Sequence, residues 1–469
     1  MESNGEFEGF WWLPEEEEVR LHGRLRRLRN GNWEFFVRGD NTAISKWKSE
    51  GRRDVIHGLD ESGLRISVLD SILESYQPIS GGLHRLRFFS RLIAVGVHTT
   101  AESEIMYEQY TVKYQHLHTW NDIKSEVSIP KKRISRDGVD GVTIDVTSPK
   151  PKAVTLSSGI TIEFVSAYKY QISWSKRRFL AFEHRSFVRF RHPAKVSFAE
   201  ALRHAGALRL LLTLGVGEYT NISSMFAGSS EEGDNRAVVF CHVDFHVDEE
   251  ETKDITSTQV NFPLSAIEKT LDEHLEKLFQ FYERFEAVIN QFLATKSNPT
   301  IHLENEFLNM CQSLEAIHRL TCDGEVNTED MHKKKIENIC DSVSAKHRKW
   351  LMEKLKYSNE KSFRKRLLEL VEKTWVVSES FLKDKKAFCN EVLQIRNRLV
   401  HRMSEASGFI QANFNEVLVT AWRMDLLVQI LFLLELGFSE EQVLLFLKPQ
   451  GTAYRTIRNI ALNENKPAK

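Results

Sequence analysis

FCNEVLQIRNRLVHRM (residues 388–403) is a stretch in which apolar residues recur with helical spacing. Its periodic members, at steps of four, three and four residues, are Phe388, Val392, Ile395 and Leu399. This spacing places the four side chains on one face of a helix, where they can be buried together. The stretch therefore predicts a helix that packs against a core near the end of the chain.

The end of this helix carries the pattern R-N-x-x-x-H, formed by Arg396, Asn397 and His401. Asn397 and His401 are four residues apart, so a helix places them on the same side. Arg396 and His401 are five residues apart, which corresponds to about 140° around a regular helix. Both can act on one phosphate only if the helix frays or bends, or if a second chain supplies half of the site.

These three side chains suit RNA cleavage without a metal ion. A neutral imidazole can take the proton of a ribose 2′-hydroxyl, and an imidazolium can protonate the leaving oxygen. The guanidinium of Arg396 can bind a phosphate in two places and stabilise the charge that grows on phosphorus. Asn397 can donate to a phosphate oxygen or hold the ring of His401. The alternative is that all three belong to a solvated helix surface.

The R-N-x-x-x-H pattern near a helix end resembles the signature of HEPN domains. The N-terminal sequence FEGFWWLP (residues 7–14), which precedes a β-rich region, is similar to the start of ApeA-type anti-phage HEPN proteins. The resemblance implies a dimeric helical bundle in which two copies of the motif form one composite cleft. It also implies that Arg396, Asn397 and His401 are the active residues.

The resemblance further implies a supporting residue, because an acidic or polar side chain on a neighbouring helix often assists the motif arginine in HEPN proteins. Glu315 is our candidate for this role. It lies four residues before Arg319, so an ordinary surface ion pair between the two is the alternative. Arg398 and Arg402, next to the motif, would bind the substrate by attracting the RNA backbone independently of its sequence.

Charge is distributed unevenly along the chain, although its net value is only −1. Residues 331–402 hold 19 Lys or Arg and 9 Asp or Glu, a local net charge of +10. A basic block around the motif is what a polyanion site requires. A solvated, lysine-rich helical surface is the alternative.

The five cysteines are widely spaced and form no C-x-x-C pair, so we expect neither a disulfide framework nor a zinc site. The acidic, aromatic N-terminus does not resemble a signal peptide. Apolar runs such as residues 208–214 and 426–436 are too short or too interrupted to span a bilayer. We therefore expect no contact with a membrane and a reducing cytoplasmic location.

A chain of 469 residues is too long for one ordinary core. Its sequence pattern changes once, from strand-like to helical. Residues 1–264 read mainly as short strands separated by turns such as Asn30-Gly31, with one helix that begins after Ser197. Residues 265–469 read as helices, with 331–356 as one basic helix and 414–436 as a long apolar one. The predicted fold class is α+β: a β-rich N-terminal domain, possibly built from two sub-sheets, followed by an all-α HEPN-like bundle.

The β-rich half contains no phosphate-binding glycine loop, nucleophile elbow or metal constellation. His242 and His246 would share a strand face without a third ligand, so we expect no metal and no cofactor. The first hypothesis is a metal-independent endoribonuclease of anti-phage defence that cuts host or phage RNA, with tRNA among the candidates. Its N-terminal domain would keep it silent until a phage protein triggers it. The alternatives are a non-catalytic RNA- or protein-binding sensor and, with less support, an activity in the β-rich half.

Overall fold

The computed structural model describes residues 6–28, 32–90, 92–101, 104, 106–122, 127–128, 133–135, 138–141, 145–146, 150–173, 179–228, 238–241, 255–256, 259–298, 301–401 and 406–447. The chain forms two compact units, Met1–Phe279 and Gln280–Lys469. Their boundary falls inside helix α5 (Leu271–Ser297), whereas the sequence analysis placed it after residue 264, at the start of the short helix α4 (Leu264–Ile267). The N-terminal unit is rich in strands and the C-terminal unit is helical, so the predicted α+β class is confirmed.

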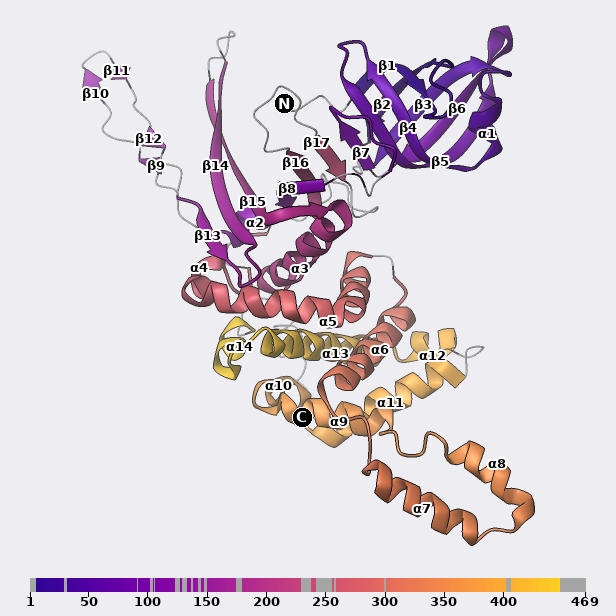
Figure 1. Cartoon of the computed structure of the whole chain (residues 1–469). Helices are drawn as coiled ribbons and strands as arrows, with labels where there is room; N and C mark the ends of the chain where they lie inside the picture. Colours follow the sequence, from indigo (N-terminus) through magenta and orange to yellow (C-terminus); the bar gives the residue numbers. More distant parts are fainter. Residues whose placement is uncertain are drawn as a thin grey trace. The chain divides into compact units, whose positions relative to one another are not determined.

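The first part of the N-terminal unit is a closed antiparallel barrel (Figure 1). Its strands are β1 (Glu6–Trp12), β2 (Leu21–Arg27), β3 (Trp33–Asp40), β4 (Arg52–Asp60), β5 (Arg65–Pro78) and β6 (Leu83–Ser90). The neighbours run in the order β4-β1-β2-β3-β6, and β5 closes the ring because it pairs with both β4 and β6. The long β5 also pairs with β7 (Leu92–Val95), which in turn pairs with β17 (Val238–Cys241).

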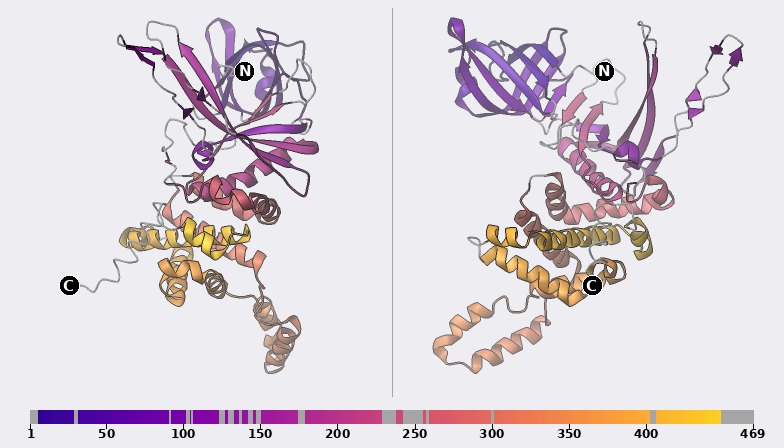
Figure 2. Two further views of the ribbon diagram at one scale, coloured as in Figure 1. Left: turned by 90° about the vertical axis from the view of Figure 1, so that its left-hand side faces the viewer. Right: turned by 180° about the vertical axis from the view of Figure 1, so that it is seen from behind.

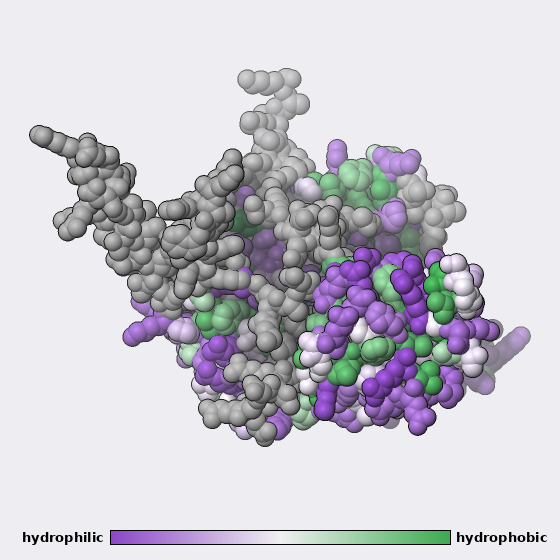
Figure 3. Space-filling model, turned by 90° about the horizontal axis from the view of Figure 1, so that it is seen from above, coloured by the Kyte–Doolittle hydropathy of each residue, from purple (hydrophilic) through white to green (hydrophobic). Residues whose placement is uncertain are grey.

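Side chains alternate between the inside and the outside of the barrel, as the two-residue period of a strand requires. The inside is filled by large aromatic rings, with Trp11 against Phe35 and Phe35 against Phe88. Helix α1 (Ser45–Ser49) contributes the fully buried Trp47 to the same cluster. Figure 3 shows hydrophilic side chains with apolar ones between them on the face of the molecule that is seen from above.

A second antiparallel sheet follows, with the order β13-β14-β15-β8-β16. Its strands are β13 (Lys152–Thr155), β14 (Thr161–Ser173), β15 (Phe179–Ser197), β8 (Met106–Tyr114) and β16 (Ile222–Gly228). Helix α3 (Phe198–Val216) contacts β8 and β15, and Ser197 caps it by accepting a hydrogen bond from the Glu200 N–H at 3.2 Å. The predicted helix start is therefore confirmed.

Short elements complete the N-terminal unit. Helix α2 (Leu117–Trp120) contacts α3, and its Trp120 ring lies against Gly215 of that helix. The described residues between 127 and 146 form two short strand pairs. These pairs join β10 (Arg133–Ser135) to β11 (Gly138–Gly141), and β12 (Asp145–Val146) to β9 (Val127–Ser128). His242 and His246 lie outside the described residues.

The C-terminal unit is a bundle of helices that follows the last part of α5 (Figures 1 and 2). The helices are α6 (Leu303–Thr321), α7 (Glu329–Asp341), α8 (Ala345–Leu355), α9 (Phe363–Lys373), α10 (Trp375–Leu382), α11 (Lys385–His401), α12 (Ala406–Ala412), α13 (Phe414–Glu435) and α14 (Glu440–Phe446). The prediction of one basic helix over 331–356 is wrong, because the chain turns at residues 342–344 and forms α7 and α8. These two helices project from the rest of the unit as a hairpin in both figures.

Helix α13 is the apolar centre of the bundle. Its Phe432 ring meets Phe281 and Phe292 of α5 edge-on, and α13 makes extensive contact with α6. By length and composition alone α13 could cross a membrane, so the expectation that every apolar run is too short or interrupted is wrong for this helix. Most of its apolar segment is buried within the protein, which is typical of a core helix.

Candidate active site

Helix α11 brings the R-N-x-x-x-H residues to its C-terminal end. The turn before the helix is tight, since Lys383 has a positive φ of 61°. Asp384 then caps the helix, because its side chain accepts a hydrogen bond from the Ala387 N–H at 2.6 Å. The helix continues without a break to His401.

The predicted buried face of α11 is confirmed. Phe388, Val392, Ile395 and Leu399 are all buried, and Cys389 extends the same face. This face contacts α9, α6 and α13, so the motif is carried by a helix that packs against three neighbours. Because packing on several sides fixes the helix, the residues at its end are held in defined directions.

Arg396 is half-buried and lies against α9. Its guanidinium carbon is 4.9 Å from the centre of the Phe363 ring, the distance of a cation–π contact. Burial raises the pKa of the Cys311 thiol on α6, and the charge of Arg396 partly opposes that rise. Among the described residues Arg396 has no carboxylate partner, so its positive charge is not neutralised by an ion pair.

Asn397 and Arg398 lie on the exposed side of the helix. The Arg398 guanidinium rests over Phe409 of α12, at 4.6 Å from the ring centre. Within the described part of the chain Arg398, like Arg396, has an aromatic partner and no acidic one. Val400 is 44% exposed in the same turn.

His401 is the last residue of α11, and its side chain is not among those the structure describes. Arg402 lies outside the described residues. Because α11 is helical through His401, the backbone does not fray between Arg396 and His401. The two residues therefore start from positions about 140° apart around the axis, as in a regular helix.

Glu315 lies on α6 and pairs with Arg319, not with Arg396, in the described part of the chain. The Arg319 guanidinium donates to Glu315 at 3.2 Å and to Glu360 at 3.1 Å. This is the surface ion pair that we weighed as the alternative. Glu315 is still close enough to Cys311 to raise the pKa of its thiol, so it shares that neighbourhood with Arg396.

A buried charged cluster between α6 and α9 was not predicted from the sequence. His318 is fully buried, with Nε2 at 2.8 Å from a Glu369 oxygen and Nδ1 at 3.3 Å from an Arg366 nitrogen. A guanidinium only donates, so Nδ1 is placed to accept from Arg366 and Nε2 to donate to Glu369. Lys361 also donates to Glu369, at 3.0 Å. The sequence offered one sign of this cluster. Arg366 lies one helical turn before Leu370, so a helix places this arginine on the apolar face that is buried.

The cysteines near the motif are poor nucleophiles. Burial raises the pKa of Cys311 to about 12 and that of Cys389 to about 11, so both are thiols at neutral pH. The side chains that the structure describes contain no group of three or more His, Cys, Asp or Glu that could hold a metal ion. Neither cysteine therefore competes with the R-N-x-x-x-H residues as the candidate for the chemistry.

Two family models together match most of the chain. The model for ApeA N-terminal domain 1 matches residues 6–278, and the model for Apea-like HEPN matches residues 308–442. The second match contains the whole of α11 and therefore the motif. No curated protein and no solved structure matches the chain.

Proposed function

The chain belongs to the ApeA family of anti-phage HEPN proteins, and on that basis we propose that it is a metal-independent endoribonuclease effector. The observation that carries the proposal is the end of α11 within the HEPN match. There Arg396 and Arg398 have aromatic partners and, among the described residues, no carboxylate partners. A guanidinium group without a carboxylate partner can bind phosphate without first breaking an ion pair.

In the proposed reaction the ribose 2′-oxygen attacks the adjacent phosphorus and the 5′-oxygen of the next nucleotide leaves. His401 takes the proton from the 2′-hydroxyl or gives a proton to the leaving oxygen, and water makes the other transfer. Arg396 binds the scissile phosphate and stabilises the charge of the pentacovalent transition state. Asn397, one helical turn before His401, orients the imidazole or donates to a phosphate oxygen. Arg398 and Arg402 bind the RNA backbone on either side.

The angle around α11 supports a site made by two chains. A regular helix separates Arg396 from His401 by about 140°, so one copy presents them in different directions. A symmetric dimer can bring Arg396 of one chain toward His401 of the other. The exposed Val400, within the motif, would then be covered by the second chain.

The N-terminal unit is assigned the role of sensor in this proposal. It would hold the helical unit inactive in the cytoplasm until a phage protein engages it. The chain would thus cut host or phage RNA only during infection.

Incubation of the protein with total cellular RNA in EDTA, alone and with extract of phage-infected cells, tests the activity. The parent protein should give discrete new fragments, and His401→Ala should give none while keeping the parent's circular dichroism spectrum. Equal cutting by both forms would remove His401 from the mechanism. Protection of RNA without any cutting in either condition would favour the alternative, a non-catalytic RNA-binding sensor.

A further inference from the structure

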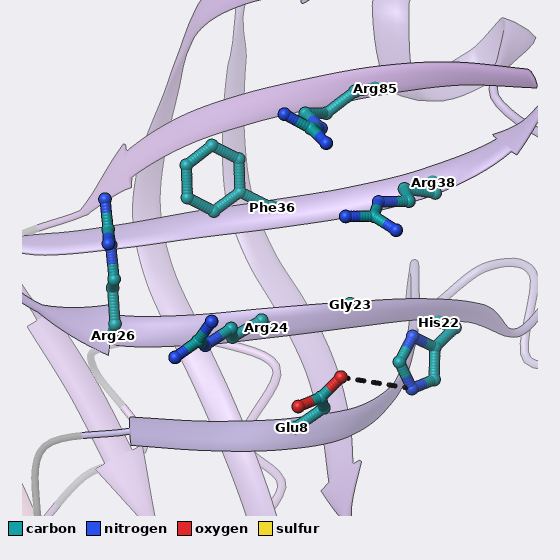
Figure 4. Close-up of a pocket in the computed structure, with 8 residues that line it drawn as sticks. All are labelled: Glu8, His22, Gly23, Arg24, Arg26, Phe36, Arg38 and Arg85. Atoms are coloured by element: carbon teal, nitrogen blue, oxygen red, sulfur yellow. Dashed lines mark ion pairs between the residues drawn. The ribbon is translucent and has the colours of Figure 1, made fainter. Parts of the chain in front are cut away.

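The outer face of the barrel has a basic hollow of about 280 Å³, over strands β1, β2, β3 and β6 (Figure 4). The side chains that matter for its chemistry are those of His22, Arg24, Arg26, Phe36, Arg38 and Arg85. Glu8 is the one acidic residue that lines it. The hollow is therefore strongly positive, although the whole chain is almost neutral.

Acidic neighbours neutralise only part of this charge. Arg24 pairs with Glu6, and Arg26 pairs with the buried Glu34. Glu8 lies 3.8 Å from His22, as the dashed line in Figure 4 marks. Within the described residues, Arg38 and Arg85 have no acidic partner.

Arg38 and Arg85 are direct cross-strand partners. They lie opposite each other in the antiparallel pair β3–β6 and project from the same side of the sheet. Like charges in this position destabilise a sheet, because the two side chains start about 5 Å apart. An anion held between the two guanidinium groups would remove that repulsion. A phosphate fits the arrangement, because guanidinium groups bind its oxygens with paired N–H groups.

The strand register continues this pair into a row of four residues. Arg85 lies opposite Arg38, Arg38 opposite His22, and His22 opposite Phe10 on β1. Phe10 is 53% exposed, and its ring meets His22 edge-on at 5.8 Å. The row thus offers two guanidinium groups at one end and a solvent-facing aromatic ring at the other.

Phe36 supports the same surface from the next row. Its ring lies 5.6 Å from the Arg26 guanidinium and 5.8 Å from that of Arg87. Arg87 is also held by ion pairs to Glu34 at 2.6 Å and to Glu74 at 2.8 Å. These contacts fix the floor of the hollow and leave Arg38 and Arg85 as the groups available to a ligand.

We propose that the row Phe10–His22–Arg38–Arg85 is a binding site for a nucleoside phosphate, either a free nucleoside triphosphate or a short segment of a single-stranded nucleic acid. A phosphate binds between Arg38 and Arg85, and a base stacks on the exposed face of Phe10. Neighbouring strands lie about 4.8 Å apart, so the terminal phosphate of a triphosphate or the next unit of a strand spans the distance between the two. Cationic grooves with stacking aromatic rings are how barrel proteins bind single strands. The site lies in the N-terminal unit and does not depend on the proposed ribonuclease activity.

The test uses the full chain carrying His401→Ala, so that the probe is not cut. One probe is an oligonucleotide of about 12 residues, a length that covers such a site, that contains 4-thiouridine. The other is 4-thiouridine triphosphate. After illumination, mass spectrometry of the peptides identifies crosslinks to the barrel separately from crosslinks to the helical unit. Titration of the barrel crosslinks gives an apparent affinity, and the better probe identifies the source of the nucleotide.

Arg38→Ala and Arg85→Ala should each weaken barrel binding about 10-fold, the loss expected for one charged hydrogen-bonding partner. Removing both should reduce the slope of log affinity against log salt by about 1.4 for the single strand. Lysine at the two positions should restore part of the affinity. The matched control is Arg52→Ala on β4, whose arginine pairs with Asp70 at 2.6 Å and should leave binding unchanged.

Phe10→Ala should weaken both nucleoside probes while leaving competition by inorganic phosphate unchanged. The proposal is overturned if neither probe crosslinks to the barrel, or if the Arg38→Ala/Arg85→Ala protein binds like the parent. It is also overturned if poly-glutamate displaces the probes as well as unlabelled nucleotide does, because the hollow would then be a surface for acidic proteins. The thermal unfolding midpoints of the variants, which should not fall, separate loss of binding from loss of folding.

Discussion

Phe363→Leu removes the aromatic ring under the Arg396 guanidinium while keeping an apolar side chain at the start of α9. Leucine is a good helix former, and the helix start is still held by Ser362, which accepts from the Lys365 N–H at 3.4 Å. The substitution should therefore change the orientation of Arg396 more than the packing of the bundle.

The size of the effect follows from the contact. A cation–π pair contributes about 0.5–1 kcal/mol when exposed and about 2 kcal/mol when desolvated. Arg396 is half-buried, at 4.9 Å from the ring, so about 1 kcal/mol is expected. If Arg396 stabilises the transition state, this loss corresponds to a rate about fivefold lower, since 1.36 kcal/mol is tenfold.

The assay is steady-state cleavage of a defined RNA, with kcat and KM measured separately. Phe409→Leu is the matched control, because it removes an equivalent ring from under Arg398, a residue assigned to substrate binding. Phe363→Leu should lower kcat, whereas Phe409→Leu should raise KM. A folded Phe363→Leu protein with the parent's kcat would refute the role given to this contact.

Three further predictions concern the N-terminal unit. Arg38→Ala should raise the free energy of unfolding by about 0.2–1 kcal/mol, because it removes a cross-strand repulsion, and a decrease in a denaturant melt would contradict this. Gly58→Ala should lower it by about 1–3 kcal/mol or more in the same assay, because the added Cβ would overlap the Trp11 indole. Burial lowers the pKa of both His192 and His204 from 6.5 to about 4, so the unfolded chain binds protons that the folded chain does not. Stability should therefore be full above pH 6.5 and decrease as the pH falls toward 4, and His204→Phe should reduce that decrease in the thermal midpoint.

Helical periodicity and capping were readable from the sequence because they depend on residues a few positions apart. The buried face of α11 and the Ser197 cap of α3 are examples, and both were predicted correctly. The break between α7 and α8 was missed because the flanking segments are both basic and were taken as one helix. Residues 342–344 are Ser-Val-Ser, and Ser344 is the N-cap residue of α8, so a signal for the break was present in the sequence.

Contacts that depend on strand register or helix packing could not be predicted from the sequence. Arg38 and Arg85 become neighbours only when β3 pairs with β6, and no local pattern sets that register. Likewise Arg366 reaches His318 only through the packing of α9 on α6. The same limit applies to the motif: its residues are close in the sequence, but the arrangement across two chains that we propose would depend on a dimer contact.

Mixing two inactive variants tests the central claim most directly. If the site is composite, a dimer of one Arg396→Ala chain and one His401→Ala chain contains one site with both native residues. Such dimers should form about half of a randomly mixed population, so the mixture should recover about one quarter of the parent's RNA cleavage. A mixture that stays inactive while dimers exchange would contradict the shared site. Full activity of either variant alone would contradict the assignment of the motif itself.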